Sequence, residues 1–187
     1  PGDLPVVGDW SGSGTTKVGV FRDGNWALDL NGNRQWDGCA VDRCLSFGQP
    51  GDTPVIGDWS GTGTAKVGVF RNGGWALDLN GNGQWDGCGI DGCIGFGGVP
   101  GDQPVVGDWS GSGTTKLGVF RDENWALDLN GIGQRDGCGT DGCVSFGQAG
   151  DTPIVGDWTG TGTAKVGVFR NGGWALDLNG NGQWDGC

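Results

Sequence analysis

The stretch GDLPVVGDWSGSGTTKVGVFRDGNWALDLNGNRQWDGCAVDRCLSFG, at residues 2–48, is one unit of a pattern that runs through the whole 187-residue chain. The tryptophan of its GDW motif recurs at spacings of 49, 50 and 49 residues, as Trp10, Trp59, Trp109 and Trp158. Self-similarity at a fixed period of this length is the sequence signature of a repeat architecture. We therefore expect four repeats, at residues 1–49, 50–99, 100–148 and 149–187, the fourth without its last strand.

Each repeat contains four short runs rich in β-branched and aromatic residues and bounded by Gly, Asn, Asp and Pro. In the first repeat we expect strands at residues 4–10, 16–22, 26–30 and 44–47. No run has the length or periodicity of a helix, and 45 glycines would penalise one. The sequence thus predicts an all-β fold of tandem four-stranded repeats of about 49 residues, the size of β-propeller blades. An open linear or superhelical β-repeat fibre is the alternative.

The composition narrows the classes of function. Eleven Trp and seven Phe argue against disorder, because each buries a large apolar area. The chain has no His, so Ser/His/Asp and Cys/His catalytic sets cannot form, and we expect no enzyme. The net charge of −11 argues against nucleic acid as a partner. The sequence contains no apolar run of about 18 residues, so we expect no membrane-spanning helix.

One segment carries a family resemblance. FGQPGDTPVIGDWSGTGTAKVGVF, at residues 47–70, resembles an FG-GAP/VCBS-type repeat, whose pattern is an FG, a strand, a GDxxGDG-like loop and a strand containing VF. The match covers about half of each repeat and recurs along the chain. The resemblance implies β-propeller blades, calcium in the loops, and an extracellular role in adhesion or ligand display.

The segment DLNGNGQWDGC, at residues 177–187, has close copies at residues 29–39, 78–88 and 128–138. Alternate residues of such a tight loop can point oxygens at one centre, and calcium takes about six to eight hard oxygen ligands. The predicted calcium ligands are Asp29, Asn31, Asn33, Gln35 and Asp37; Asp78, Asn80, Asn82, Gln84 and Asp86; Asp128, Asn130, Gln134 and Asp136; and Asp177, Asn179, Asn181, Gln183 and Asp185. The alternative is an Asx-rich turn held by its own backbone hydrogen bonds.

The four copies do not match the calcium pattern equally. The second and fourth fit it fully, whereas the first has Arg34 where the sharp turn favours Gly, and the third has Ile132 at a ligand position. Asp42, Asp91 and Asp141 follow these loops and could add a carboxylate to the same metal.

A second loop, DWSGSGTTK at residues 9–17, has a similar outline but ends in lysine. Asp9, Ser11 and Ser13 occupy ligand positions, but the last position holds Lys17. The family loop would carry acids there, so we expect the ammonium to take the place of a metal as an internal cation; the alternative is a solvated lysine on a strand. The same position recurs as Lys66, Lys116 and Lys165.

The cysteines come in three C-x-x-x-x-C pairs, for which disulfides, zinc sites and redox sites compete. Zinc would need four ligands without any His, and a redox dithiol usually has C-x-x-C spacing. We therefore expect local disulfides Cys39–Cys44, Cys88–Cys93 and Cys138–Cys143, which imply an oxidising, extracellular compartment. Cys187 would find its partner five residues further on, so we expect the 187 residues to be a segment of a longer repeating chain.

Two classes of function remain open. Near-identical repeats with disulfides and ions are typical of a structural protein in a surface array, stalk or fibre, whose partners are neighbouring repeats or further copies. The alternative is a lectin-like or adhesion module that binds carbohydrate. Its sugars would stack on exposed Trp36, Trp85 and Trp184, although these could also be core or inter-repeat residues, and the third repeat has Arg135 there.

Overall fold

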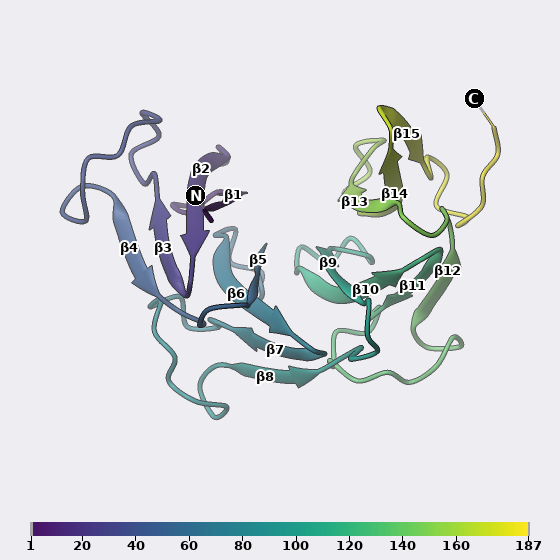
Figure 1. The fold of residues 1–187 in the computed structure, drawn as a ribbon, viewed down its shortest axis with the longest axis horizontal. Helices are drawn as coiled ribbons and strands as arrows, with labels where there is room; N and C mark the ends of the chain where they lie inside the picture. Colours follow the sequence, from purple (N-terminus) through teal and green to yellow (C-terminus); the bar gives the residue numbers. More distant parts are fainter. Residues whose placement is uncertain (1, 187) are drawn as a thin grey trace. The chain divides into compact units, whose positions relative to one another are not determined.

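The computed structural model describes residues 2–186, and these form fifteen β-strands in four small sheets, one for each repeat (Figure 1). The strands are β1 (Leu4–Gly8), β2 (Lys17–Arg22), β3 (Asn25–Leu28) and β4 (Arg43–Ser46) in repeat 1; β5 (Thr53–Gly57), β6 (Lys66–Arg71), β7 (Gly74–Leu77) and β8 (Gly92–Gly95) in repeat 2; β9 (Gln103–Gly107), β10 (Lys116–Arg121), β11 (Asn124–Leu127) and β12 (Gly142–Ser145) in repeat 3; and β13 (Thr152–Gly156), β14 (Lys165–Arg170) and β15 (Gly173–Leu176) in repeat 4.

Each sheet is an antiparallel meander in which neighbours in the sheet are also neighbours in the sequence. The first three sheets have four strands, and the fourth has three within the described residues. This confirms the all-β prediction of repeated, propeller-like blades. Among residues 2–186, no helix has the length and apolar character needed to span a bilayer.

The first and third strands of repeat 1 end two residues earlier than predicted. β1 stops at Gly8 because Trp10 turns into the core, where its indole Nε1–H donates to the carbonyl of Val18 at 3.3 Å. β3 stops at Leu28 because the carboxylate of the next residue, Asp29, accepts the backbone N–H groups of Gly32 and Arg34, at 2.6 and 2.7 Å, and so turns the chain into a loop.

An aromatic pair fixes the centre of each blade. In repeat 1, Phe21 on β2 lies opposite Trp26 on β3, with ring centroids 4.7 Å apart. The Trp26 indole also donates to the Phe47 carbonyl at 2.8 Å, so this buried polar group is satisfied. Gly19 lies opposite Leu28, and a Cβ on it would stand 2.7 Å from the Leu28 side chain, so the close approach requires glycine.

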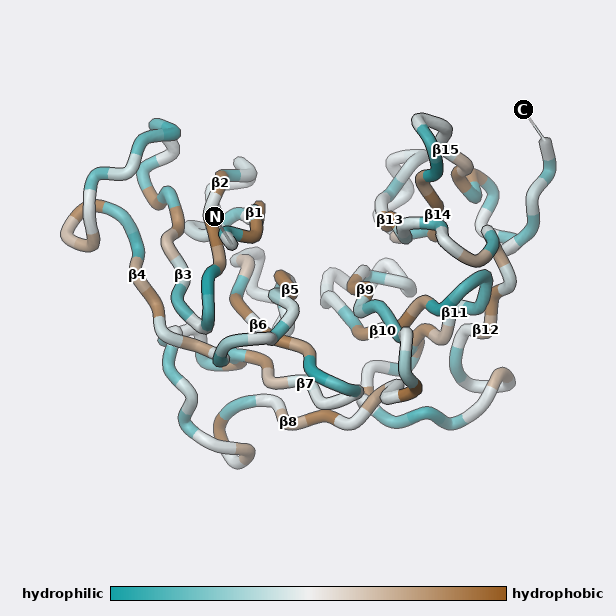
Figure 2. Tube along the Cα trace, viewed as in Figure 1, coloured by the Kyte–Doolittle hydropathy of each residue, from teal (hydrophilic) through white to brown (hydrophobic). Residues whose placement is uncertain are grey.

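The described chain divides into two compact units, one up to Ile94 and one from Gly95 onward. Each unit has a core drawn from two repeats. The core of the first unit contains Val6, Trp10, Phe21, Trp26, Leu28, Phe47, Val67 and Val69; that of the second contains Val105, Trp109, Phe120, Trp125, Leu127, Phe146, Val166 and Val168. Figure 2 shows that hydrophobic stretches lie within strands such as β14, whereas the loops between strands are largely hydrophilic.

Within each unit, the two repeats are joined by the same backbone contact. Ala65 N–H donates to the Asp9 carbonyl at 2.9 Å in the first unit, and Ala164 N–H donates to the Asp108 carbonyl at 2.8 Å in the second. Because this hydrogen bond links equivalent positions in both units, the first repeat of each unit packs against the second in the same way.

Candidate cation-binding loops

The loop after β7 begins at a buried aspartate that binds its own backbone. The Asp78 carboxylate accepts the N–H of Gly81 through Oδ1 and the N–H of Gly83 through Oδ2, both at 2.8 Å. Burial raises the pKa of Asp78, and although these two hydrogen bonds oppose it, the net shift is upward. The first residue of the predicted ligand set therefore organises the turn from inside.

The two asparagines of this loop form Asx turns and converge on the last aspartate. The side-chain oxygen of Asn80 accepts the Asn82 N–H at 2.9 Å, and that of Asn82 accepts the Gln84 N–H at 2.8 Å. Their amide Nδ2 groups donate to the same Asp86 oxygen, at 2.9 and 2.6 Å. Gln84 takes part through its backbone N–H, so four of the five predicted positions form one network, while Asp78 binds the glycines between them.

The other loops repeat this arrangement with one weak copy. Nδ2 of Asn31 and Asn33 lie 3.1 and 2.6 Å from Asp37 Oδ2, and those of Asn179 and Asn181 lie 2.7 and 3.1 Å from Asp185 Oδ2. In the third loop, Asn130 donates to Asp136 at 3.0 Å, and the exposed Ile132 has no amide to donate. The carboxylate of Asp136 therefore accepts from one asparagine side chain instead of two.

In the first two repeats, the aspartate of the cysteine loop braces both ends of the candidate calcium loop. Asp91 accepts the Leu79 N–H at 3.3 Å and the Asp86 N–H at 2.8 Å, and Asp42 does the same for Leu30 and Asp37, at 3.1 and 2.8 Å. Asp141 accepts the Asp136 N–H at 2.7 Å, but its buried Oδ1 has no hydrogen-bond partner. That these aspartates add a ligand to a metal stays a prediction.

The donor set of the loop suits calcium after one local change. Carboxylate and amide oxygens are the hard ligands that calcium takes, and turning the amides of Asn80 and Asn82 by half a rotation would place oxygen, instead of nitrogen, beside Asp86. This rotation would break the two Asx hydrogen bonds, so binding competes with the turn. Within residues 2–186, no three His, Cys, Asp or Glu side chains lie close enough together to hold a metal ion. A bound calcium would therefore depend on amide and carbonyl oxygens as well.

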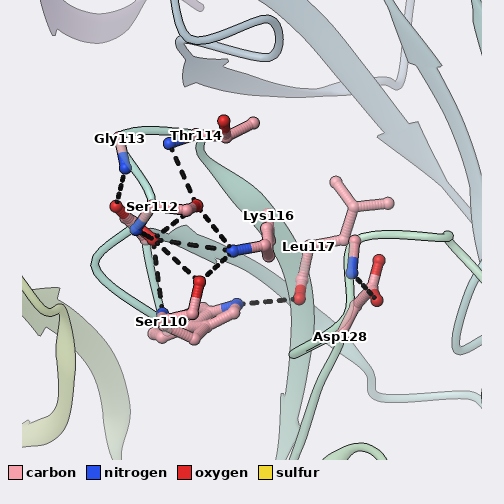
Figure 3. A network of polar contacts seen from close by, with 10 residues as sticks. Ser110, Ser112, Gly113, Thr114, Lys116, Leu117 and Asp128 are labelled. Carbon is pink, nitrogen blue, oxygen red and sulfur yellow. Dashed lines mark hydrogen bonds and ion pairs between the residues drawn. The ribbon is translucent and has the colours of Figure 1, made fainter.

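The second type of loop encloses a lysine ammonium group (Figure 3). Lys116 Nζ donates to the hydroxyls of Ser110 and, at 2.9 Å, Ser112, and lies 3.6 Å from Asp108 Oδ1. Only 9% of the Lys116 side chain is exposed. Burial raises the pKa of Asp108, but hydrogen bonds from the backbone amides of Ser112 and Gly113 outweigh it and leave a lowered pKa.

The same arrangement recurs in the other three repeats. The Nζ–Oδ1 distances are 3.6 Å for Lys17–Asp9, 3.9 Å for Lys66–Asp58 and 3.9 Å for Lys165–Asp157. The lysine stem also packs on the neighbouring loop, because a Cβ on Gly81 would lie 3.2 Å from Lys66 Cε. The lysine thus touches both loop types of its repeat.

An aspartate–arginine pair in every repeat escaped the sequence reasoning. Arg71 donates to Asp52, whose side chain is fully buried, and the pair raises the pKa of Arg71. The corresponding ion pairs are Arg22–Asp3, Arg121–Asp102 and Arg170–Asp151. The signal was present, since the Asp of GD-x-P and the Arg of VFR recur with a constant separation of 19 residues.

The three expected disulfides are present. Cys39–Cys44, Cys88–Cys93 and Cys138–Cys143 have Cα–Cα distances of 5.3, 5.1 and 5.1 Å. Cys187, for which we expect a partner five residues further on, lies outside the described residues.

The three candidate stacking tryptophans, Trp36, Trp85 and Trp184, are about half exposed. Trp85 sets its ring edge-on to Phe47 of the preceding repeat, with centroids 5.9 Å apart. It therefore serves a contact between repeats while part of its ring stays accessible.

Comparisons with protein-family models and with curated proteins both find no match to this chain.

Proposed function

We propose that this chain is a non-enzymatic structural repeat module of the extracellular space, belonging to a surface array, stalk or fibre. The recurrence of the same stabilising devices in successive repeats carries the proposal. Each complete repeat has a local disulfide, a buried aspartate that braces a loop and a second loop closed around an ammonium group. These groups hold the chain's own backbone, as expected where the product is a stable shape.

The recurrence also weighs against catalysis. A catalytic centre requires a constellation that differs from its surroundings, whereas the carboxylates here occupy equivalent positions in each repeat. The Asp78 oxygens accept backbone N–H groups, and Asp86 accepts two side-chain amides. Carboxylates held in this way stabilise turns.

Calcium belongs to the proposal as a further stabiliser. Asp78, Asn80, Asn82 and Asp86 would hold it in the second repeat, together with the Gln84 carbonyl, and the equivalent residues would do so in the fourth. An ion that binds only the folded chain raises its stability by mass action. The resemblance to FG-GAP/VCBS-type repeats implies calcium in the other loop, which here encloses the lysine, so the calcium assignment rests on the ligand pattern of residues 78–86 and its copies.

The proposed location follows from the disulfides. Three local bridges are compatible with an oxidising compartment, because cytosolic thiols are normally kept reduced. Secretion or display at the cell surface would provide that environment.

A lectin-like or adhesion function is the second candidate, and the half-exposed tryptophans favour it. Trp36 lies beside Val18, Val20 and Arg34 along a groove of about 380 Å³. An aromatic face next to polar groups is a surface on which a sugar ring could stack. This candidate predicts that binding depends on the tryptophan.

Glycan-array screening of the oxidised chain separates the two candidates. For a structural module we expect no glycan bound above background by the native chain, and resistance to protease that falls when the disulfides are reduced. Specific binding that Trp36→Ala removes and Val41→Ala retains would replace the structural proposal with the lectin. Val41 is a suitable control because it is an exposed apolar residue of the same repeat that does not line the groove.

A further inference from the structure

Each second repeat of a unit presents a covered surface to the repeat before it. We call this the leading face; in repeat 2 it consists of Val67 and Val69 on β6 with Gly83 and Trp85 of the loop after β7. Val67 and Val69 are only 1% and 5% exposed, because repeat 1 covers them. In repeat 4, Val166 and Val168 are buried in the same way against repeat 3.

The glycine of the leading face is required by the neighbouring repeat. A Cβ on Gly83 would lie 2.2 Å from Cδ2 of Leu45 on β4 and 3.0 Å from Leu45 Cβ. Since Leu45 Cβ is fixed to the backbone, no change of rotamer clears that contact. Gly182 faces Val144 similarly, with a Cβ at 2.8 Å from Val144 Cγ1. A side chain at Gly83 would therefore push the preceding repeat away, whereas at Gly182 the Val144 Cβ lies at 3.5 Å and only the Val144 methyl groups would have to move.

Repeat 1 carries Arg34 at this position, in the same loop conformation. Its φ is 65°, against 75° for Gly83, and its N–H donates to Asp29 Oδ2 at 2.7 Å, as the Gly83 N–H does to Asp78 at 2.8 Å. The Arg34 Cβ therefore stands where a Cβ on Gly83 would collide. The leading face of repeat 1 is also open, with Val18 48% and Val20 38% exposed.

We propose that Arg34 selects which repeat can seat on the leading face of repeat 1. A repeat with a branched apolar residue at the Leu45 position is excluded, whether it precedes residue 2 or belongs to a second copy of the chain. The first three repeats of this chain are excluded by this criterion, because they carry Leu45, Ile94 and Val144 there. The accepted partner is a repeat of the same kind with glycine at that position, which leaves room for Arg34 and covers Val18 and Val20.

This inference goes beyond the proposed function, because it concerns which blade can join the array, and it gives the groove that the lectin candidate assigns to a sugar a different occupant. It also accounts for the groove beside Arg34 and Trp36 as an unfilled repeat interface with altered specificity.

An extended chain tests the selection directly. A copy of residues 1–49 is fused before residue 1 of the full chain. The original repeat 1 carries Val20→Cys, and Cys187→Ser removes the other thiol, so the rate at which this new cysteine is alkylated reports whether the leading face is covered. When Arg34 of the original repeat and the leucine at position 45 of the added repeat are both unchanged, we expect the same rate as in the chain without the added repeat. Arg34→Gly, or replacement of the added leucine by glycine, should each slow alkylation at least tenfold. Equal protection in all three chains overturns the proposal, and so does no protection in any of them.

The unextended chain provides a second test. Gly83→Arg is compared with the control Gly63→Arg. The φ of Gly63, 79°, is close to that of Gly83, 75°, but no atom lies within 4 Å of a Cβ built on Gly63. The control variant therefore has the backbone strain without the collision. We expect Gly83→Arg to lower the melting temperature by several degrees more than Gly63→Arg. Adding Leu45→Gly should reduce that excess, and equal melting temperatures for the two arginine variants would contradict the steric argument.

Discussion

The carboxylate of Asp91 accepts the backbone N–H of Asp86 at 2.8 Å, so a residue inside the disulfide loop holds the last residue of the candidate calcium loop. Its other oxygen accepts the N–H of Leu79 near the beginning of that loop. Three of the four repeats contain this link between two neighbouring loops, and it explains why a covalent bridge follows the loop so closely.

Removing this brace should destabilise the chain. Asp91→Ala leaves two backbone N–H groups without their acceptor, and we expect a loss of about 1–3 kcal/mol in the free energy of unfolding, measured by urea denaturation. Asp141→Ala is the matched control: Asp141 accepts one N–H and buries an unpaired oxygen, so its loss should be smaller. A larger loss for Asp141→Ala would contradict the bracing role.

The enclosed lysine should contribute modestly to the free energy of unfolding. Lys66→Ala removes the donor to the hydroxyls of Ser60 and Thr62, but Asp58 keeps hydrogen bonds from Thr62 and Gly63. We therefore expect a loss of about 1 kcal/mol, less than for a carboxylate left unpaired. Lys66→Met retains most of the stem that packs near Gly81 and should lose less than alanine. Unchanged stability in the alanine variant would show that the ammonium group contributes nothing.

Acid should weaken the chain through the second type of loop. Burial raises the pKa of Asp58, but the backbone hydrogen bonds of Thr62 and Gly63 outweigh it, so the folded pKa lies below the unfolded value of about 3.9. The unfolded chain therefore binds protons first, and the stability supplied by Asp58 is complete above about pH 4 and is lost as the pH falls toward the folded pKa.

Urea denaturation between about pH 5 and pH 2 measures this loss. Asp58→Asn should flatten the dependence of unfolding free energy on pH below about pH 4. Asp122→Asn, at an exposed turn position that asparagine also tolerates, serves as the control. If both variants retain the slope of the native chain, the Asp58 loop is not a source of acid sensitivity.

Calcium should raise the melting temperature, and a substitution in the third candidate calcium loop should strengthen its calcium binding. Asn82 and Asn181 occupy the position that Ile132 takes in repeat 3, so Ile132→Asn supplies the missing oxygen and should enlarge the calcium-dependent shift. Asn82→Ile is the reverse change and should reduce it. Scanning calorimetry in millimolar calcium and in chelator measures both, and identical melting temperatures in the two solutions would refute the calcium assignment.

The sequence by itself determined the features that depend on neighbouring residues. The period gave the repeats, and the clusters of β-branched and aromatic residues gave the four strands of each meander. The five-residue spacing of the cysteines gave the disulfides. Tight turns, strand patterns and short covalent loops are local, so a single repeat contains the information for them. Only the strand ends were displaced, where Trp10 turns into the core and Asp29 opens a loop.

Tertiary structure decided what depends on residues far apart in the chain. Gly83 appears in the sequence as a turn glycine, but the reason it excludes a side chain is Leu45, which is 38 residues earlier and on another sheet. In repeat 1 the same loop carries Arg34, and Val18 and Val20 of the leading face are exposed there. Packing between sheets depends on which surfaces meet, and the pattern of a single repeat does not encode the residue that the next sheet places against it.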